Sequence, residues 1–236
     1  MSRHLIMSDF GSKTYSAWRD SAGEIWQQYI DHEFVVRLGD GSLPRTAFIA
    51  YLVQDYIYLL HYSRAWALAV VKSENAAQMR LAATTVNALI NEEIMLHVGI
   101  CEREGISEQS LLEATEASEN VAYSRYIMDA GFSGDLLDLL AALAPCVFGY
   151  AEIGAKLNDC TNTPDLYREW IDTYSSADYT GACHAVARLI EQVVLAKIGT
   201  DPQSSPRWTS LCQRFNTVTQ LEVDFWAMGI RLGKPA

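Results

Sequence analysis

The amino-acid sequence predicts an all-α protein built as a helical bundle. Apolar side chains recur at three- and four-residue steps through nearly the whole chain of 236 residues, and this spacing lines one face of a helix. No convincing alternation of apolar and polar residues indicates a strand. Half of the residues are hydrophobic, so a substantial core is available. Because no linker or repeat divides the chain, we expect a single helical domain over residues 1–236.

Capping residues, glycines and prolines place the expected helices. The helix that contains Asp55 begins near the Leu43–Pro44 step, because proline is favoured in the first turn. The other helices are expected, in chain order, over residues 15–31, 75–104, 108–130, 134–157, 164–175, 177–198 and 205–232. Short loops between them are marked by Gly39 and Gly41, by Gly105, by Gly131 and Gly134, by the 162–164 turn and by residues 199–206.

The charge balance excludes several classes of partner. The net charge is −11 and the isoelectric point is near 4.8, and we find no cluster of Lys and Arg that would bind nucleic acid or an anionic membrane. The first 13 residues lack the apolar core of a signal peptide, and no run reaches the ~18 uncharged apolar residues of a membrane span. We expect a soluble cytoplasmic protein.

The cysteines and histidines do not indicate a metal site. Five cysteines lie without C-x-x-C spacing, which fits reduced thiols better than disulfides. The five histidines form no ligand cluster, so each is expected to be a surface or hydrogen-bonded packing residue. Glu93 and His97 are four residues apart, whereas di-iron bundles repeat a Glu-x-x-His motif on paired helices.

An aspartate interrupts the apolar stripe of the segment 38–66. Asp55 therefore points at the core, where a carboxylate is costly to desolvate unless it finds hydrogen-bond partners, a cation or a ligand. We expect function around it. The stripe consists of Phe48, Tyr51, Leu52, Asp55, Tyr58, Leu59, Tyr62 and Trp66.

Two further helices carry one reactive group each on a buried stripe. Cys146 lies among leucines in the helix after Gly134, with Tyr150 one turn later. Glu222 interrupts the stripe of the last helix, where burial is expected to push its pKa upward, toward the range of an acid/base catalyst. In a bundle these groups can meet.

Each residue alone also has a structural interpretation. A single buried cysteine is usually an inert small hydrophobe. A buried acid is often paired with an arginine, and Arg64 and Arg125 are available. Tyrosines at helical spacing are more often core residues than ligand-binding residues. Only the coincidence of a thiol, two acids and several tyrosines favours a site.

Four segments carry a resemblance to a known family. They are HEFVVRLGDGSLPRTAFIAYLVQDYIYL at 32–59, LAPCVFGYAEIG at 143–154, WIDTYSS at 170–176 and LEVDFWAMG at 221–229. In these residues the chain resembles the thiaminase II (TenA) family, the aminopyrimidine aminohydrolases of thiamin salvage, and the similarity extends over nearly the whole chain. The resemblance implies the haem-oxygenase-like helical fold and assemblies that are commonly homotetramers.

The resemblance also implies residue roles. Cys146 takes the place of the nucleophile, Glu222 that of the acid/base glutamate, and Asp55 that of the aspartate that holds the aminopyrimidine ring. No metal or organic cofactor is implied. The expected reaction is hydrolysis of 4-amino-5-aminomethyl-2-methylpyrimidine, and more weakly of thiamin, to the hydroxymethylpyrimidine. The tyrosines expected to line the pocket are Tyr58, Tyr123, Tyr150 and Tyr174.

Two other functions remain open at this point. A cofactorless oxidase of the pyrroloquinoline-quinone synthesis type shares the fold, but its polyanionic substrate needs basic residues, whereas the inward polar groups here are acidic. A non-catalytic regulator that binds thiamin or a pyrimidine would not need the thiol of Cys146. Haem oxygenase itself is disfavoured, because His32 fits the family's H-x-F turn better than a haem ligand.

Overall fold

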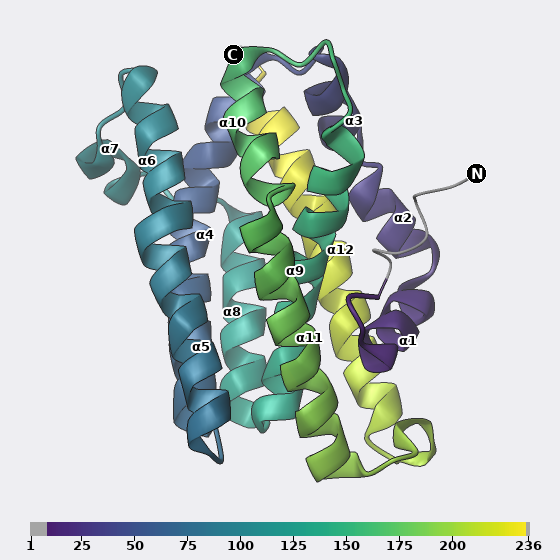
Figure 1. Cartoon of the computed structure of the whole chain (residues 1–236). Helices are drawn as coiled ribbons and strands as arrows, with labels where there is room; N and C mark the ends of the chain where they lie inside the picture. The colour runs from purple at the N-terminus through teal and green to yellow at the C-terminus, as the bar shows by residue number, and fades with distance from the viewer. Residues whose placement is uncertain (1–8, 235–236) are drawn as a thin grey trace.

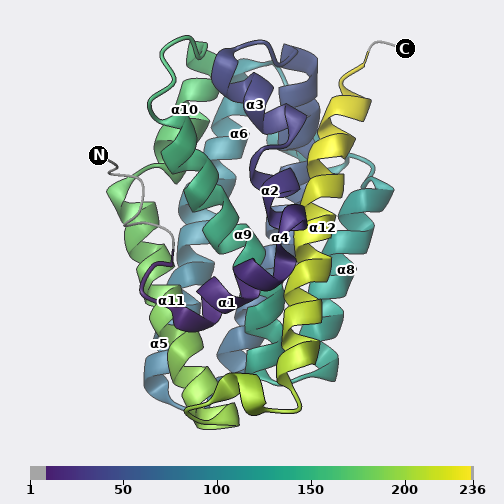
Figure 2. The same ribbon diagram turned by 90° about the vertical axis from the view of Figure 1, so that its right-hand side faces the viewer.

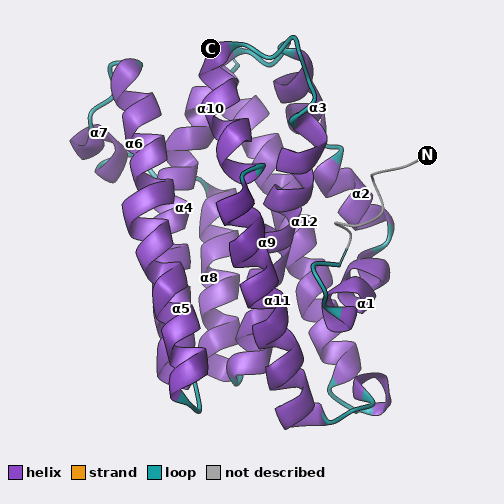
Figure 3. Ribbon diagram, viewed as in Figure 1, coloured by secondary structure: helices purple, strands orange, loops and turns teal. Residues whose placement is uncertain are grey.

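The computed structural model describes residues 9–234, and every regular element in that range is helical (Figure 3). The all-α prediction is confirmed. The elements are α1 (Lys13–Ala22), α2 (Glu24–Ile30), α3 (Glu33–Asp40), α4 (Arg45–Lys72), α5 (Ala76–Ala88), η2 (Leu89–Glu93), α6 (Ile94–Arg103), α7 (Glu108–Leu112), α8 (Ser118–Ser133), α9 (Leu136–Leu157), α10 (Asp165–Tyr174), α11 (Ala177–Ile198), η3 (Pro202–Ser204) and α12 (Trp208–Leu232).

The long helices run side by side along the bundle, as two views at right angles agree (Figures 1 and 2). The helix α9 contacts α12, α11, α8, α10, α4 and α2. It is long and apolar enough to cross a membrane, but 89% of the apolar window is buried within the bundle. That burial is the environment of a core helix. The expectation about a signal peptide concerns residues 1–13, of which the first eight lie outside the described part.

The helix α4 begins where the sequence predicted. Pro44 stands at its N-cap with an extended backbone, because proline lacks the N–H that a first turn leaves unpaired. The whole predicted stripe of α4, Asp55 included, is buried. This helix packs against α5, α6, α8, α9 and α12, so its inward groups reach the centre of the bundle.

Two predictions for the N-terminal third are wrong in detail. The helix expected over 15–31 is divided into α1 and α2 at Gly23, whose φ of 52° lies in the left-handed region that favours glycine. The loop expected around Gly39 begins only at Gly41, since α3 extends to Asp40. The side chain of His32 caps α3 by accepting a hydrogen bond from the Phe34 backbone N–H at 3.1 Å.

Two other expected helices are interrupted. The segment expected as one helix over 75–104 contains the π-helical turn η2, in which the Ile94 N–H bonds to the Leu89 carbonyl five residues earlier. The helix expected over 108–130 ends at Leu112 and resumes as α8 at Ser118. A π turn inserts one extra residue into a helix and often marks a functional region. Here it changes which side chains of α6 face the core.

Candidate active site

The three groups predicted on buried stripes all lie inside the bundle. Cys146 on α9 is 5% exposed, Asp55 on α4 is 2% exposed and Glu222 on α12 is 1% exposed. The three helices contact one another in every pair. The carboxylates of Glu222 and Asp55 both act on the Cys146 thiol through their charge. The thiol and the two acids therefore border one interior region.

Glu222 accepts a hydrogen bond from one of the predicted pocket tyrosines. The Tyr123 hydroxyl on α8 donates to Oε1 of Glu222 at 2.5 Å. Burial raises the pKa of Glu222 to about 8, and the hydrogen bond from Tyr123 offsets part of that rise. A carboxyl group with such a pKa is present in both its protonated and its ionised form near neutral pH, so it can give a proton and take one.

Neither buried acid is paired with the arginines that the structural interpretation offered. Arg125 pairs with Glu116 at 2.9 Å, and Arg64 is an exposed residue whose guanidinium lies 3.4 Å from His61. The buried acids are held by tyrosine and histidine side chains instead. A purely structural ion pair does not account for them.

The Cys146 side chain is a protonated thiol at rest. Burial raises its pKa well above the usual value, and the negative charges of Glu222 and Glu93 raise it further. Since the thiolate is the nucleophilic form, attack by Cys146 requires a base that takes its proton. The second cysteine of this region, Cys183, donates its S–H to the Val147 carbonyl at 3.4 Å, and burial raises its pKa too strongly for it to ionise near neutral pH.

Asp55 has two hydrogen-bond partners, both on the same oxygen. The Tyr51 hydroxyl lies 2.8 Å from Oδ2, and Nε2 of His97 lies 2.7 Å from that atom. No hydrogen bond to Oδ1 is formed within residues 9–234. His97 was expected to be a surface or hydrogen-bonded packing residue, and it is the second of these, fully buried. Sequence analysis missed its link to Asp55 because the two residues lie 42 positions apart on different helices.

The four predicted tyrosines are buried in two aromatic groups. The rings of Tyr58 and Tyr123 have centroids 4.6 Å apart, and Phe225 packs against both. Those of Tyr150 and Tyr174 lie 4.9 Å apart, and Trp170 packs against that pair. Flat rings of this kind can stack on a heterocycle.

Two buried hydroxyl groups near the acids form no hydrogen bond of ordinary geometry within residues 9–234. They are the hydroxyl of Tyr29 on α2, which lies toward Glu222, and that of Tyr58 on α4, which lies toward the Cys146 thiol. Charges on Glu222 and Cys146 act on both tyrosines, which places them beside these groups. The ring of Tyr29 packs directly against Gly149 of α9. A Cβ atom added to Gly149 would lie 2.1 Å from that ring, so only glycine leaves room for it. Because a buried hydroxyl without a partner is costly, these two are available to a polar ligand.

Glu93 is a titratable group that the sequence analysis set aside. The Tyr174 hydroxyl donates to Oε1 of Glu93 at 2.6 Å. Burial raises the pKa of Glu93 to about 7, against the opposing effects of the Tyr174 hydrogen bond and of His97. The π turn η2 brings this side chain inward. Within residues 9–234 no group of three or more His, Cys, Asp or Glu side chains is arranged to hold a metal ion.

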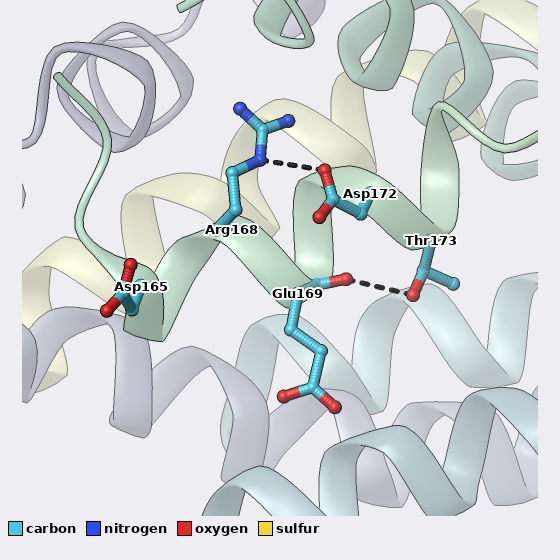
Figure 4. A pocket seen from close by; sticks show the side chains of 5 residues that line it. All are labelled: Asp165, Arg168, Glu169, Asp172 and Thr173. Atoms are coloured by element: carbon cyan, nitrogen blue, oxygen red, sulfur yellow. Dashed lines mark hydrogen bonds and ion pairs between the residues drawn. The ribbon is translucent and has the colours of Figure 1, made fainter. Parts of the chain in front are cut away.

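A hollow on the outer face of α10 is a poorer candidate. Its volume is about 500 Å³ and it is lined by side chains of that single helix (Figure 4). Arg168 pairs with Asp172 of the same helix at 2.7 Å, and the Thr173 hydroxyl donates to the Glu169 carbonyl at 2.9 Å. The hollow contains none of the predicted site residues, so the buried region remains the candidate.

Comparison with known proteins identifies relatives over most of the chain. The chain is 33% identical over 89% of its length to an aminopyrimidine aminohydrolase of Halalkalibacterium halodurans, covering 92% of that protein. It superposes with a TM-score of 0.91 and 53% identity on a crystal structure described as a TenA family transcription regulator from Silicibacter sp. TM1040, over 95% of this chain and 99% of the other.

The fold itself extends to more distant proteins. A domain of unknown function from Shewanella denitrificans, described as having a heme oxygenase-like fold, matches with a TM-score of 0.69 at 9% identity, over 92% of this chain and 91% of the other. The sequence model of the TENA/THI-4/PQQC family matches residues 19–232. The resemblance seen in the four segments is thereby confirmed, and the chain belongs to the TENA/THI-4/PQQC family.

Proposed function

We propose that the protein is an aminopyrimidine aminohydrolase of thiamin salvage, with Cys146 as its nucleophile and Glu222 as its acid/base. The substrate is 4-amino-5-aminomethyl-2-methylpyrimidine, with thiamin as a weaker one, and the product is 4-amino-5-hydroxymethyl-2-methylpyrimidine. Relatives that carry the name aminopyrimidine aminohydrolase support a hydrolase. The observation that carries the proposal is the burial of a thiol and two acids, from three mutually contacting helices, around one region.

In the first step Sγ of Cys146 forms a bond to the pyrimidine ring, and its proton passes to the carboxylate of Glu222. The C–N bond of the aminomethyl group then breaks, and Glu222 returns the proton to the departing amine. Because burial raises the pKa of Glu222 to about 8, one carboxyl group can serve as base and then as acid.

In the second step water adds to the methylene carbon and gives a proton to Glu222. The C–S bond breaks, and the sulfur of Cys146 regains its proton. The sum is one amine released and one hydroxyl gained, with the enzyme unchanged. The unpartnered hydroxyls of Tyr29 and Tyr58 are suited to hold the incoming water or the amine by hydrogen bonds.

Recognition of the ring falls to Asp55 and the aromatic side chains. A carboxylate accepts hydrogen bonds from the exocyclic amine and, when the ring is protonated, from its neighbouring nitrogen. Since Oδ2 already accepts bonds from Tyr51 and His97, Oδ1 is the oxygen left for the substrate. Tyr58, Tyr123, Tyr150 and Tyr174 provide the walls.

The test is turnover by purified protein and by two cysteine variants. Wild-type protein should release hydroxymethylpyrimidine from the aminomethylpyrimidine, and more slowly from thiamin. Cys146→Ala should lose about 10³-fold or more of this activity, as a missing covalent nucleophile does. Cys183→Ala removes a neighbouring buried thiol and should retain it. Wild-type turnover by Cys146→Ala would end the nucleophile assignment.

A second candidate function is suggested by one relative, which is described as a transcription regulator. A regulator that binds a pyrimidine without changing it has no use for a reactive thiol. Alkylation of Cys146 should abolish turnover, and bound aminopyrimidine should protect the thiol. Binding without any product release would favour the regulator. Release of an oxidised product with consumption of O₂ would instead favour an oxidase.

We also propose that residues 1–236 form a single cytoplasmic domain that assembles as a homotetramer. Large apolar side chains exposed on the described surface are consistent with assembly, among them Val71 at 79% and Phe132 at 71% exposure. Light scattering of the purified protein gives the mass of the assembly directly, and a monomer would contradict this proposal.

A further inference from the structure

Asp55 and His97 form a closely bonded pair in the interior. Nε2 of His97 lies 2.7 Å from Oδ2 of Asp55, and Nδ1 of His97 lies 2.7 Å from the Glu93 carbonyl oxygen. The side chain of His97 has no exposed surface, and that of Asp55 is 2% exposed. Both ends of the imidazole ring are therefore engaged, and water does not reach either one.

The partners of His97 determine its protonation. The Glu93 carbonyl oxygen can only accept a hydrogen bond, so Nδ1 carries a proton. On the other side, Oδ2 of Asp55 accepts a hydrogen bond from Tyr51, and a carboxylate oxygen can accept a second one from an Nε2–H group of His97. An imidazole ring with two N–H groups is the imidazolium cation.

The π turn η2 explains how His97 reaches this place. In this turn the Ile94 N–H bonds to the Leu89 carbonyl five residues earlier, so α6 continues with a shifted register. Within the helix that follows this turn, His97 faces Asp55 of α4 and has the Glu93 carbonyl against its Nδ1.

The groups around His97 favour its charge. From α4 it faces Asp55 and Tyr51, and from η2 it faces Glu93. The acid of α7, Glu108, lies instead against the Tyr56 hydroxyl at 3.5 Å. Burial by itself lowers the pKa of His97, but the hydrogen bond and charge of Asp55 outweigh it, so the pKa is raised. None of the groups in these contacts is a cation that would lower the pKa of His97.

We propose that His97 is a positioning residue, a buried imidazolium that holds Oδ2 of Asp55 and turns its free oxygen Oδ1 toward the aminopyrimidine. The inference rests on the proposed substrate-binding role of Asp55 and assigns a residue that supports it. The Asp55–His97 pair carries no net charge, so Asp55 can accept from the amine of an unprotonated ring. Without His97, Oδ2 of Asp55 would keep only the hydrogen bond from Tyr51, and the carboxylate would be less firmly oriented.

The test compares His97→Gln with wild type and with His184→Gln. Glutamine retains a donor toward Asp55 but removes the charge. KM for the aminomethylpyrimidine should rise at least about tenfold, with a smaller change in kcat. His184, whose Nδ1 meets the Phe10 carbonyl at 2.9 Å on another face, serves as the control and should change neither.

A direct measurement separates this inference from the proposed function. Nitrogen-15 spectra of histidine-labelled wild-type protein at pH 7 should show two N–H signals for His97, assigned by their loss in His97→Gln. A single N–H, or an unchanged KM in a folded His97→Gln variant, would overturn the inference. An inactive wild-type protein with a doubly protonated His97 would overturn the proposed function instead, and with it the positioning role.

Discussion

The two ends of the buried site differ in how well their polar groups are satisfied. We call Asp55, Tyr51 and His97 the binding end, and Cys146 and Glu222 with their neighbouring tyrosines the reaction end. At the binding end the two hydrogen bonds to Oδ2 measure 2.7 and 2.8 Å. At the reaction end the thiol is protonated, Glu222 has a raised pKa, and two tyrosine hydroxyls lack partners.

This difference separates holding a ligand from reacting with it. A carboxylate held by two hydrogen bonds on one oxygen is fixed in place with its other oxygen free, and such pre-organisation is what recognition of a rigid ring requires. A buried acid that keeps its proton near neutral pH, beside hydroxyls with spare hydrogen-bonding capacity, is what proton transfer requires. Changes at the reaction end should therefore lower kcat, whereas changes at the binding end should raise KM.

The largest expected effect comes from removing the acid/base group of the reaction end. Glu222→Gln should lower kcat by about 10³-fold, within the range of a lost general acid–base, and leave KM within a few-fold of wild type. Steady-state kinetics with the aminomethylpyrimidine measures both constants. Glu152→Gln is the matched control, because burial raises the pKa of Glu152 as well, yet its carboxylate binds Trp26 and Arg19 away from the site. If Glu222→Gln raised KM and left kcat unchanged, the proposed difference between the reaction end and the binding end would be wrong.

A smaller effect is expected from the unpartnered hydroxyls. Tyr29→Phe and Tyr58→Phe should each lower kcat by about tenfold, since each removes one hydrogen bond to a reacting group. Neither should lower the melting temperature, because a buried hydroxyl without a partner contributes nothing to stability. Tyr15→Phe removes another buried, unpartnered hydroxyl that no site charge reaches, and should retain full activity. If all three variants had the same kcat, the hydroxyls of Tyr29 and Tyr58 would have no role in the reaction.

The smallest effect is on stability and depends on pH. The pKa of Glu222 is about 8 in the folded protein against a usual value of 4.5. Between these values the folded state binds a proton that the unfolded state has lost, so the free energy of unfolding falls as pH rises. Glu93, with its pKa raised to about 7, acts in the same direction.

In Glu222→Gln the free energy of unfolding should therefore fall less as pH rises. At pH 8 this variant should melt several degrees above wild type, since about 1 kcal/mol shifts the midpoint by about 2–4 °C in a chain of this size. Thermal melts at pH 5, 6.5 and 8 measure it. At pH 5 the wild-type and variant melting points should approach each other. A constant difference at all three pH values would contradict the ionisation of Glu222 as its source.

The inward direction of the reactive groups follows from local pattern. Asp55 and Glu222 each interrupt an apolar stripe, Cys146 lies on one among leucines, and all three are buried as expected. The predicted helix over 177–198 coincides with α11, because Ser176 caps its first turn and Gly199 ends it with a φ of 84°. The break at Gly23 left a weaker signal, since one glycine within a periodic stretch is also compatible with a continuous helix.

The pairing of groups across helices has no such local signal. His97 meets Asp55 from 42 positions away, Tyr174 meets Glu93 from 81 and Tyr123 meets Glu222 from 99. The π turn that brings Glu93 and His97 inward leaves no mark in apolar spacing, because both residues still lie in a helical stretch. Their roles were therefore missed.

The sequence alone determined that this protein is helical and which face of each helix turns inward, because apolar periodicity is a property of neighbouring residues in one segment. Only the tertiary structure decided that Asp55 is held by His97 and that Glu222 is held by Tyr123. These contacts depend on how each helix is rotated and shifted against the next, and that is set by close packing of side chains from distant segments.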